Sequence, residues 1–306
     1  MKEKTIKKIL KGKFENLLKS IDDNKIKELF RKGTIITGGC ITSMLLNEDV
    51  NDFDMYFKDP ETAYQISNYY VKKFNSQETV KNKGVPVRIS VKREWDRVNI
   101  VVKSAGIAGR DNQASYNYFE GLGANETESD TYIDSAIHFS KSDVKDIKRG
   151  EYKPIVLTSN AITLSSEVQL ILRFIGSPEE IHKNYDFIHC TNYWTSWDGE
   201  LVLNKEALLA IMTKELKYQG SLYPICSMFR VRKFIERGWT INAGQILKMA
   251  FQISKLNLED ILVLQDQLTG VDVSYFHELI NVLKQEIVNG KTIDNVYISK
   301  LIDEIF

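Results

Sequence analysis

The sequence predicts an α+β protein: a mixed, mainly antiparallel sheet flanked by helices, followed by an all-helical C-terminal domain. Short strand-like apolar runs alternate with helical patterns up to about residue 197. From about Lys205 onward every apolar run has a helical period. The composition, 43% hydrophobic and 27% charged, is typical of a globular protein that buries a sizeable core. We therefore expect two domains, over residues 1–197 and 198–306.

The first half of the head has a regular order of elements. Apolar residues spaced by three and four predict amphipathic helices near the start, and Pro60 is a favourable first residue for a later helix. Asp52 to Phe57 is an apolar run that predicts a strand. The expected elements are helices over 5–21 and 24–31, a strand over 34–37, a helix from the glycine pair to about 46, a strand over 52–57 and a helix over 61–74.

The second half of the head is less regular. Alternating residues in 85–92 and 97–103 predict an antiparallel pair. Residues 104–150, rich in Gly, Asn, Ser and Asp, predict a long insertion or lid loop with little core of its own. Strand patterns return in 154–164 and 185–190, whereas 168–174 fits either a helix or a strand.

Charge and cysteine content exclude several classes of protein. Lys plus Arg and Asp plus Glu each number 41, so the formal net charge is zero. A polyanion such as nucleic acid would therefore have to bind to a local patch of basic residues. Cys40, Cys190 and Cys226 have no CxxC spacing, which indicates neither a disulfide framework nor a zinc site. The basic start lacks a secretory signal, and no run approaches about 18 consecutive apolar residues. These features predict a cytoplasmic protein without a membrane span.

Two short motifs carry the candidate chemistry. Gly38 and Gly39 precede a predicted helix, where free backbone N–H groups and the helix dipole favour a bound phosphate. Asp52 and Asp54, two apart on a predicted strand, point to the same face and could share Mg²⁺. Each motif alone is a common turn or a solvated acidic pair. Together, in this order, they predict a site for a metal-bound nucleoside triphosphate.

The order strand, Gly-Gly, helix, Asp-x-Asp resembles the polymerase-β-like nucleotidyltransferase superfamily. Within it, GGCITSMLL and DFD are similar to the first motif of CCA-adding tRNA nucleotidyltransferases and bacterial poly(A) polymerases, with Thr42 and Ser43 in place of Arg and Asp. SPEEIHKNYDFIHC resembles the Arg-Arg-Asp motif and retains only Asp186. The resemblance also reaches related phage-encoded proteins, which indicates a viral protein acting in the host cytoplasm.

A third motif resembles the nucleotide-templating helix of that family. LYPICSMFRVRKFIERGWTI retains Pro224, Arg232 and the Gly-Trp end. The templating Glu, Asp and Arg are replaced by Leu222, Tyr223 and Cys226. The resemblance therefore implies the family's chemistry but not its order of C, C and A addition.

The resemblance implies a template-independent nucleotidyltransferase that moves NMP from an NTP to an acceptor hydroxyl at an RNA or tRNA 3′ end. Mg²⁺ would be the cofactor, held by Asp52 and Asp54. Asp186 would act as a third carboxylate or a ribose contact. The implied nucleotide contacts are Gly38, Gly39, Ser43, Arg230, Arg232 and Lys233.

The basic residues and the acceptor leave alternatives open. Arg230, Lys233 and Arg237 form one helical stripe, which fits phosphates as well as a solvated face paired with acids such as Glu236. The acceptor could instead be a protein side chain or a small molecule, which the balanced charge favours. A non-catalytic module that binds nucleotide or RNA is a further alternative, because the Arg-Arg and templating residues are lost.

Overall fold

The computed structural model describes residues 1–76, 88–94, 97–103, 151–157, 160–260, 263–264, 267, 282–283, 286, 289–290 and 294–305. The chain forms two compact units, and each is described by itself. The first contains residues 1–182 and 190–211, and the second contains residues 183–189 and 212–306. The expected domain boundary near residue 197 stays a prediction.

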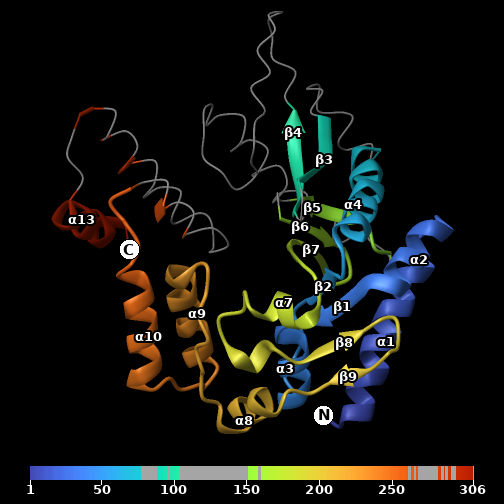
Figure 1. Ribbon diagram of the computed structural model, residues 1–306, viewed down its shortest axis with the longest axis horizontal. Coiled ribbons are helices and arrows are strands. Elements are labelled where there is room, and N and C mark those ends of the chain that lie inside the picture. The colour runs from blue at the N-terminus through green and yellow to red at the C-terminus, as the bar shows by residue number, and fades with distance from the viewer. Residues whose placement is uncertain are drawn as a thin grey trace, which may run out of the picture. The chain divides into compact units, whose positions relative to one another are not determined.

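A seven-stranded sheet forms the centre of the first unit (Figure 1). Its order is β5-β6-β7-β2-β1-β8-β9. Only β2 and β7 pair in parallel, so the predicted mixed, mainly antiparallel sheet is confirmed. The strands are β1 (Thr34–Thr37), β2 (Phe53–Phe57), β5 (Pro154–Leu157), β6 (Ala161–Leu164), β7 (Val168–Ile175), β8 (Tyr193–Thr195) and β9 (Leu201–Val202).

Helices of the first unit begin where the sequence offers caps. The Asp23 carboxylate accepts the N–H of Lys25 (2.8 Å) and of Ile26 (3.3 Å) at the start of α2. Asp59 accepts the N–H of Thr62 at 2.8 Å, and Pro60 opens α4. The helices are α1 (Glu3–Lys19), α2 (Asn24–Gly33), α3 (Gly39–Leu46), α4 (Pro60–Asn75) and α7 (Pro178–His182).

The core of the first unit lies on one face of the sheet. Apolar side chains of α1, α2 and α4 pack there against alternate strand residues such as Phe53, Met55 and Leu170. The rings of Phe14 and Trp194, 5.3 Å apart, belong to this core. The antiparallel pair β3 (Arg88–Glu94) and β4 (Arg97–Lys103) contributes Ile89 and Ile100. The opposite face carries Asp54 and Thr37 together with apolar side chains such as the fully buried Ile35.

The second unit is helical in its described residues, apart from isolated bridges between Phe187 and Tyr218 and between Glu215 and Thr240. α9 packs against α10. The helical tail predicted after residue 205 is confirmed over the described residues. The helices after residue 205 are α8 (Lys205–Thr213), most of which belongs to the first unit, and α9 (Pro224–Glu236), α10 (Ala243–Ile253) and α13 (Asn295–Ile305) of the second.

One predicted strand is wrong, and one ambiguity is resolved. Residues 185–190 form a single bridge at Phe187 and the 3-10 turn η2 (Ile188–Cys190), because residues up to His189 leave the sheet and pack in the second unit. There the ring of His189 lies 4.4 Å from that of Trp239. Residues 168–175 form a strand, β7.

The predicted lid at 104–150 lies outside the described residues, and so does most of 275–288, one of the runs after Lys205 with a helical period. No helix within the described ranges is long and apolar enough to cross a membrane.

Candidate functional site

A glycine turn joins β1 to α3. Gly38 has φ 97° and ψ −150°, a conformation that only glycine adopts without strain. Gly39 is the first residue of α3, and a Cβ added there would meet no atom within 4 Å. The first N–H groups of α3 have no partner within the helix, so an anion can approach Gly39 closely.

Two carboxylates lie at the start of β2. Asp54 is in the strand and half-buried, whereas the more exposed Asp52 immediately precedes it. Phe53 and Met55 point into the core, so Asp52 and Asp54 share the other face. Burial and the charge of Asp52 raise the pKa of Asp54 to about 7, and burial also raises that of Asp52. Within the described residues, neither carboxylate has a hydrogen-bond or ion-pair partner, so their charge is uncompensated.

Strand register brings the carboxylates beside the glycine turn. Ile36 pairs with Met55, which places the next residue of β1, Thr37, beside Asp54. Burial, and next the charge of Asp54, raises the pKa of the Cys40 thiol in the first turn of α3. The carboxylates of Asp52 and Asp54 thus lie next to a helix N-terminus that favours anions. A phosphate bound there would be repelled by these carboxylates unless a cation lay between them.

Ser43 lies one helical turn after Gly39 on α3 and is buried. This spacing puts both residues on the same side of the helix. On the other side of Asp54, Gln169 is its paired residue on β7 and donates to the Thr163 hydroxyl at 3.4 Å. A polar strip therefore crosses β2, β7 and β6 on the face opposite the core.

Asp52 and Asp54 fit Mg²⁺ better than a metal held wholly by protein. Within the described residues no group of three or more His, Cys, Asp or Glu is placed to hold a metal. Mg²⁺ commonly takes one or two carboxylates and completes its shell with water and substrate phosphates. The uncompensated charge of the pair and the open space at Gly39 match that coordination.

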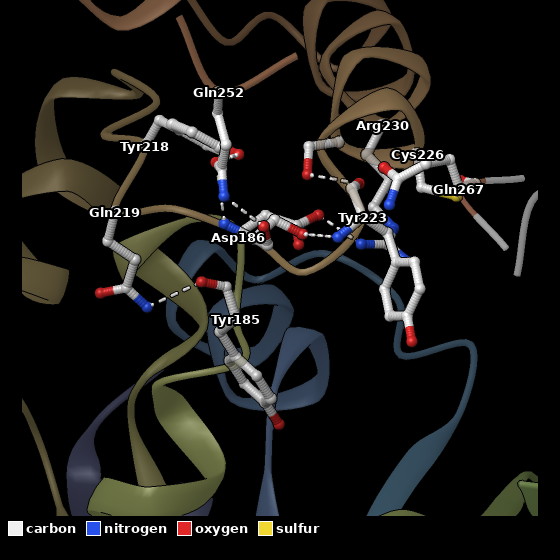
Figure 2. A network of polar contacts seen from close by, with 11 residues as sticks. Tyr185, Asp186, Tyr218, Gln219, Tyr223, Cys226, Arg230, Gln252 and Gln267 are labelled. Carbon is white, nitrogen blue, oxygen red and sulfur yellow. Dashed lines mark hydrogen bonds and ion pairs between the residues drawn. The ribbon is translucent and has the colours of Figure 1, made fainter. Parts of the chain in front are cut away.

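Asp186 and Arg230 belong to the second unit, where they form an ion pair (Figure 2). Asp186 is 6% exposed, whereas the Arg230 side chain is 44% exposed. Gln219 donates its backbone N–H to the carbonyl of Asp186 (3.0 Å) and its side-chain amide to the carbonyl of Tyr185 (3.0 Å). Asp186, predicted as a third carboxylate or a ribose contact, and Arg230, predicted as a nucleotide contact, are therefore partners of each other.

The other predicted contacts of α9 differ in exposure. Arg232 is exposed and pairs with Glu236 at 3.2 Å, and Lys233 is exposed. Cys226, at a position of the templating motif, is buried and donates its thiol to the carbonyl of Gln267 at 2.8 Å. Its thiol is thus already engaged inside the second unit.

Sequence reasoning missed three polar residues around the first-unit site. Gln169 faces the same side as Asp54, and Thr37 and His182 are hydrogen-bonded behind the glycine turn. Two signals were available: Thr37 immediately precedes the glycines, and Gln169 and Arg173 interrupt an otherwise apolar run from Val168.

Comparison with known proteins gives two kinds of similarity. The fold resembles that of CCA-adding enzymes at 11% identity. The match to the Thermotoga maritima enzyme complexed with tRNA covers 79% of this chain and 45% of the chain of that enzyme, with a TM-score of 0.39. The match to the Bacillus stearothermophilus enzyme in complex with CTP covers 88% of this chain and 51% of the chain of that enzyme, with a TM-score of 0.36.

In sequence, the chain is 19% identical over 286 residues to Gabija anti-defense 2 of Bacillus phage SPbetaL7. The match covers 93% of this chain and 53% of that relative, so the chain spans about half of the relative's length. The phage origin of this relative agrees with the predicted resemblance to phage-encoded proteins. A family model for Gabija anti-defense 2 proteins matches residues 8–214, more than half of the chain. The chain belongs to the Gad2, or Gabija anti-defense 2, family.

Proposed function

We propose that this protein is a metal-dependent nucleotidyltransferase that moves NMP from an NTP to an acceptor hydroxyl. The observation that carries the proposal is the uncompensated pair Asp52 and Asp54 beside the open helix N-terminus at Gly39. Membership of an anti-defense family supports a use of this chemistry against the Gabija defence.

Each residue of the site has a defined task in this proposal. Asp52 and Asp54 hold Mg²⁺, and the N–H groups after Gly38 bind the triphosphate, with Ser43 one turn behind. A bound Mg²⁺ would supply charge neutralisation at the phosphate oxygens and a lower pKa for the attacking hydroxyl. The acceptor oxygen bonds to the α-phosphorus, the bond from that phosphorus to the bridging oxygen breaks, pyrophosphate leaves and the hydroxyl proton passes to water. Asp186 and Arg230, also predicted from the sequence, are paired with each other within the second unit.

An RNA or tRNA 3′ end is the first acceptor that we propose. The exposed cations Arg232 and Lys233 suit a phosphate backbone. Base selection should be relaxed, because discrimination depends on polar groups that the wrong base leaves unpaired. Leu222 is apolar, and the Cys226 thiol is already bonded to a carbonyl.

A protein component of the Gabija defence is the second candidate acceptor. The family description favours it, and so does the formal net charge of zero, which provides no global attraction to nucleic acid. In both cases the donor chemistry at the first-unit site is the same.

The test is a transfer assay with each α-labelled NTP, with and without Mg²⁺. One arm contains an RNA pool that includes tRNA lacking its CCA end, and the other contains an extract from cells that carry the Gabija defence. We expect Mg²⁺-dependent label on one acceptor, lost in Asp54→Asn and kept in the control Asp49→Asn, which changes an exposed acid before β2. Nucleotide binding without transfer in either arm would favour a non-catalytic module. Transfer by Asp54→Asn at the native rate would refute the proposed site.

A further inference from the structure

A chain of polar groups, buried at Thr37 and half-buried at His182, lies directly behind the glycine turn. Thr37, the last residue of β1, is fully buried. Its hydroxyl oxygen lies 2.8 Å from the carbonyl oxygen of Asn192 and 2.8 Å from Nε2 of His182. The neighbouring N–H of Gly38 donates to the carbonyl of Cys190 at 3.2 Å. The turn is therefore fixed by two segments that are distant in sequence, residues 190–192 and the end of α7.

The proton positions in this chain follow from its geometry. A carbonyl oxygen cannot donate, so the Thr37 hydroxyl donates its single proton to Asn192. The carbonyl of Cys190 is a more distant second acceptor at 3.4 Å, so the contact with His182 is a hydrogen bond at the same time when Nε2 carries a proton and donates to the hydroxyl oxygen. Burial lowers the pKa of His182 to about 4, so the ring is neutral near pH 7 and donates without adding a charge.

The imidazole is held in place by its surroundings. His182 ends α7, and its ring centroid lies 5.6 Å from that of Tyr193 on β8. Tyr193 pairs with Thr37 in the sheet, so both side chains lie on the face that carries Asp54. The hydrogen bond from His182 thus stabilises the residue that sets the direction of the turn.

We propose that His182 is a positioning residue that orients the β1–α3 turn through Thr37, so that the N–H groups after Gly38 are directed at the triphosphate. This role rests on the proposed nucleotidyl transfer and requires no contact between His182 and substrate. It explains why the chain buries the Thr37 hydroxyl and Asn192 beside a half-buried imidazole, where apolar packing would cost less.

Three variants test the role by NTP affinity, KM and kcat, and melting temperature. His182→Phe retains a ring beside Tyr193 but has no donor, and His182→Gln retains an N–H near the position of Nε2. Thr37→Val removes the acceptor with nearly the same shape. We expect His182→Phe and Thr37→Val each to weaken NTP binding about tenfold, as the loss of one buried hydrogen bond allows, with KM changed more than kcat. His182→Gln should stay within about twofold of the native affinity.

The double variant decides whether the two residues act together. His182→Phe with Thr37→Val should bind NTP no more weakly than Thr37→Val alone, because Thr37→Val already removes the hydrogen bond from His182 together with the one to Asn192. An imidazole N–H resonance protected in the native protein should be lost in Thr37→Val.

Native NTP affinity in His182→Phe, or additive losses in the double variant, would overturn the positioning role while leaving the proposed function intact. If the native protein binds no NTP with Mg²⁺, the proposed function fails and the positioning role fails with it.

Discussion

Asp54→Asn should stabilise the folded protein while abolishing nucleotidyl transfer. Asparagine has nearly the same shape as aspartate, but it carries no charge to be buried beside Asp52. The pKa of Asp54 is about 7 in the folded protein and 3.8 in the reference state. At about 1.36 kcal/mol per pKa unit, this difference corresponds to about 4 kcal/mol at most. Since Asp54 is partly exposed, water lowers this figure, and we expect about 2–4 kcal/mol.

The effect should depend on pH with a defined sign. Between about pH 4 and 7 the folded state binds a proton at Asp54 that the unfolded state has released, so native stability falls as the pH rises through this window. The asparagine variant lacks that contribution. The gain in stability over the native protein should therefore be small at pH 4, grow through the window and remain constant above pH 7.

Chemical denaturation at several pH values, with and without Mg²⁺, measures this effect. Mg²⁺ should stabilise the native protein more than Asp54→Asn, because the metal binds the ionised carboxylates. The exposed acid Asp49 supplies the control, and Asp49→Asn should change stability by less than about 0.5 kcal/mol at every pH. A stability gain of Asp54→Asn that is equal at pH 4 and pH 8, or a loss at pH 8, would refute the uncompensated charge on which the metal site depends.

Three further outcomes are expected. Gly39→Ala should melt at the native temperature, because a Cβ there meets nothing within 4 Å, but its methyl group should weaken NTP binding at least tenfold. Gly38→Ala should instead lower the free energy of unfolding by about 1–3 kcal/mol, because residue 38 has φ 97°. Arg230→Ala should lower the free energy of unfolding by about 2 kcal/mol, because it removes the ion-pair partner of the buried Asp186. Arg232→Ala should lower it by less than about 0.5 kcal/mol, because the ion pair of Arg232 with Glu236 is exposed. NTP with Mg²⁺ should raise the melting temperature of the native protein, and no shift at millimolar NTP would contradict the binding site.

The sequence alone was enough to predict the elements that build the first-unit site. Alternation and caps are local properties, so β1, α3 and α4 could be placed within one or two residues of their bounds. Gly38 and Gly39 could be located because the change from a strand to a helix needs a residue free to adopt positive φ. The shared face of Asp52 and Asp54 followed from the two-residue period of a strand.

Only the tertiary structure decided which distant residues meet. The strand predicted for residues 185–190 failed because Phe187 and His189 pack on aromatic residues of the second unit, and burial of those rings outweighs their local β-propensity. The ion pair of Asp186 with Arg230 joins residues 44 positions apart, and the hydrogen bond between Thr37 and His182 spans 145, so neither leaves a periodic signal in the sequence. The raised pKa of Asp54 likewise depends on burial by the surrounding sheet, which no spacing of residues encodes.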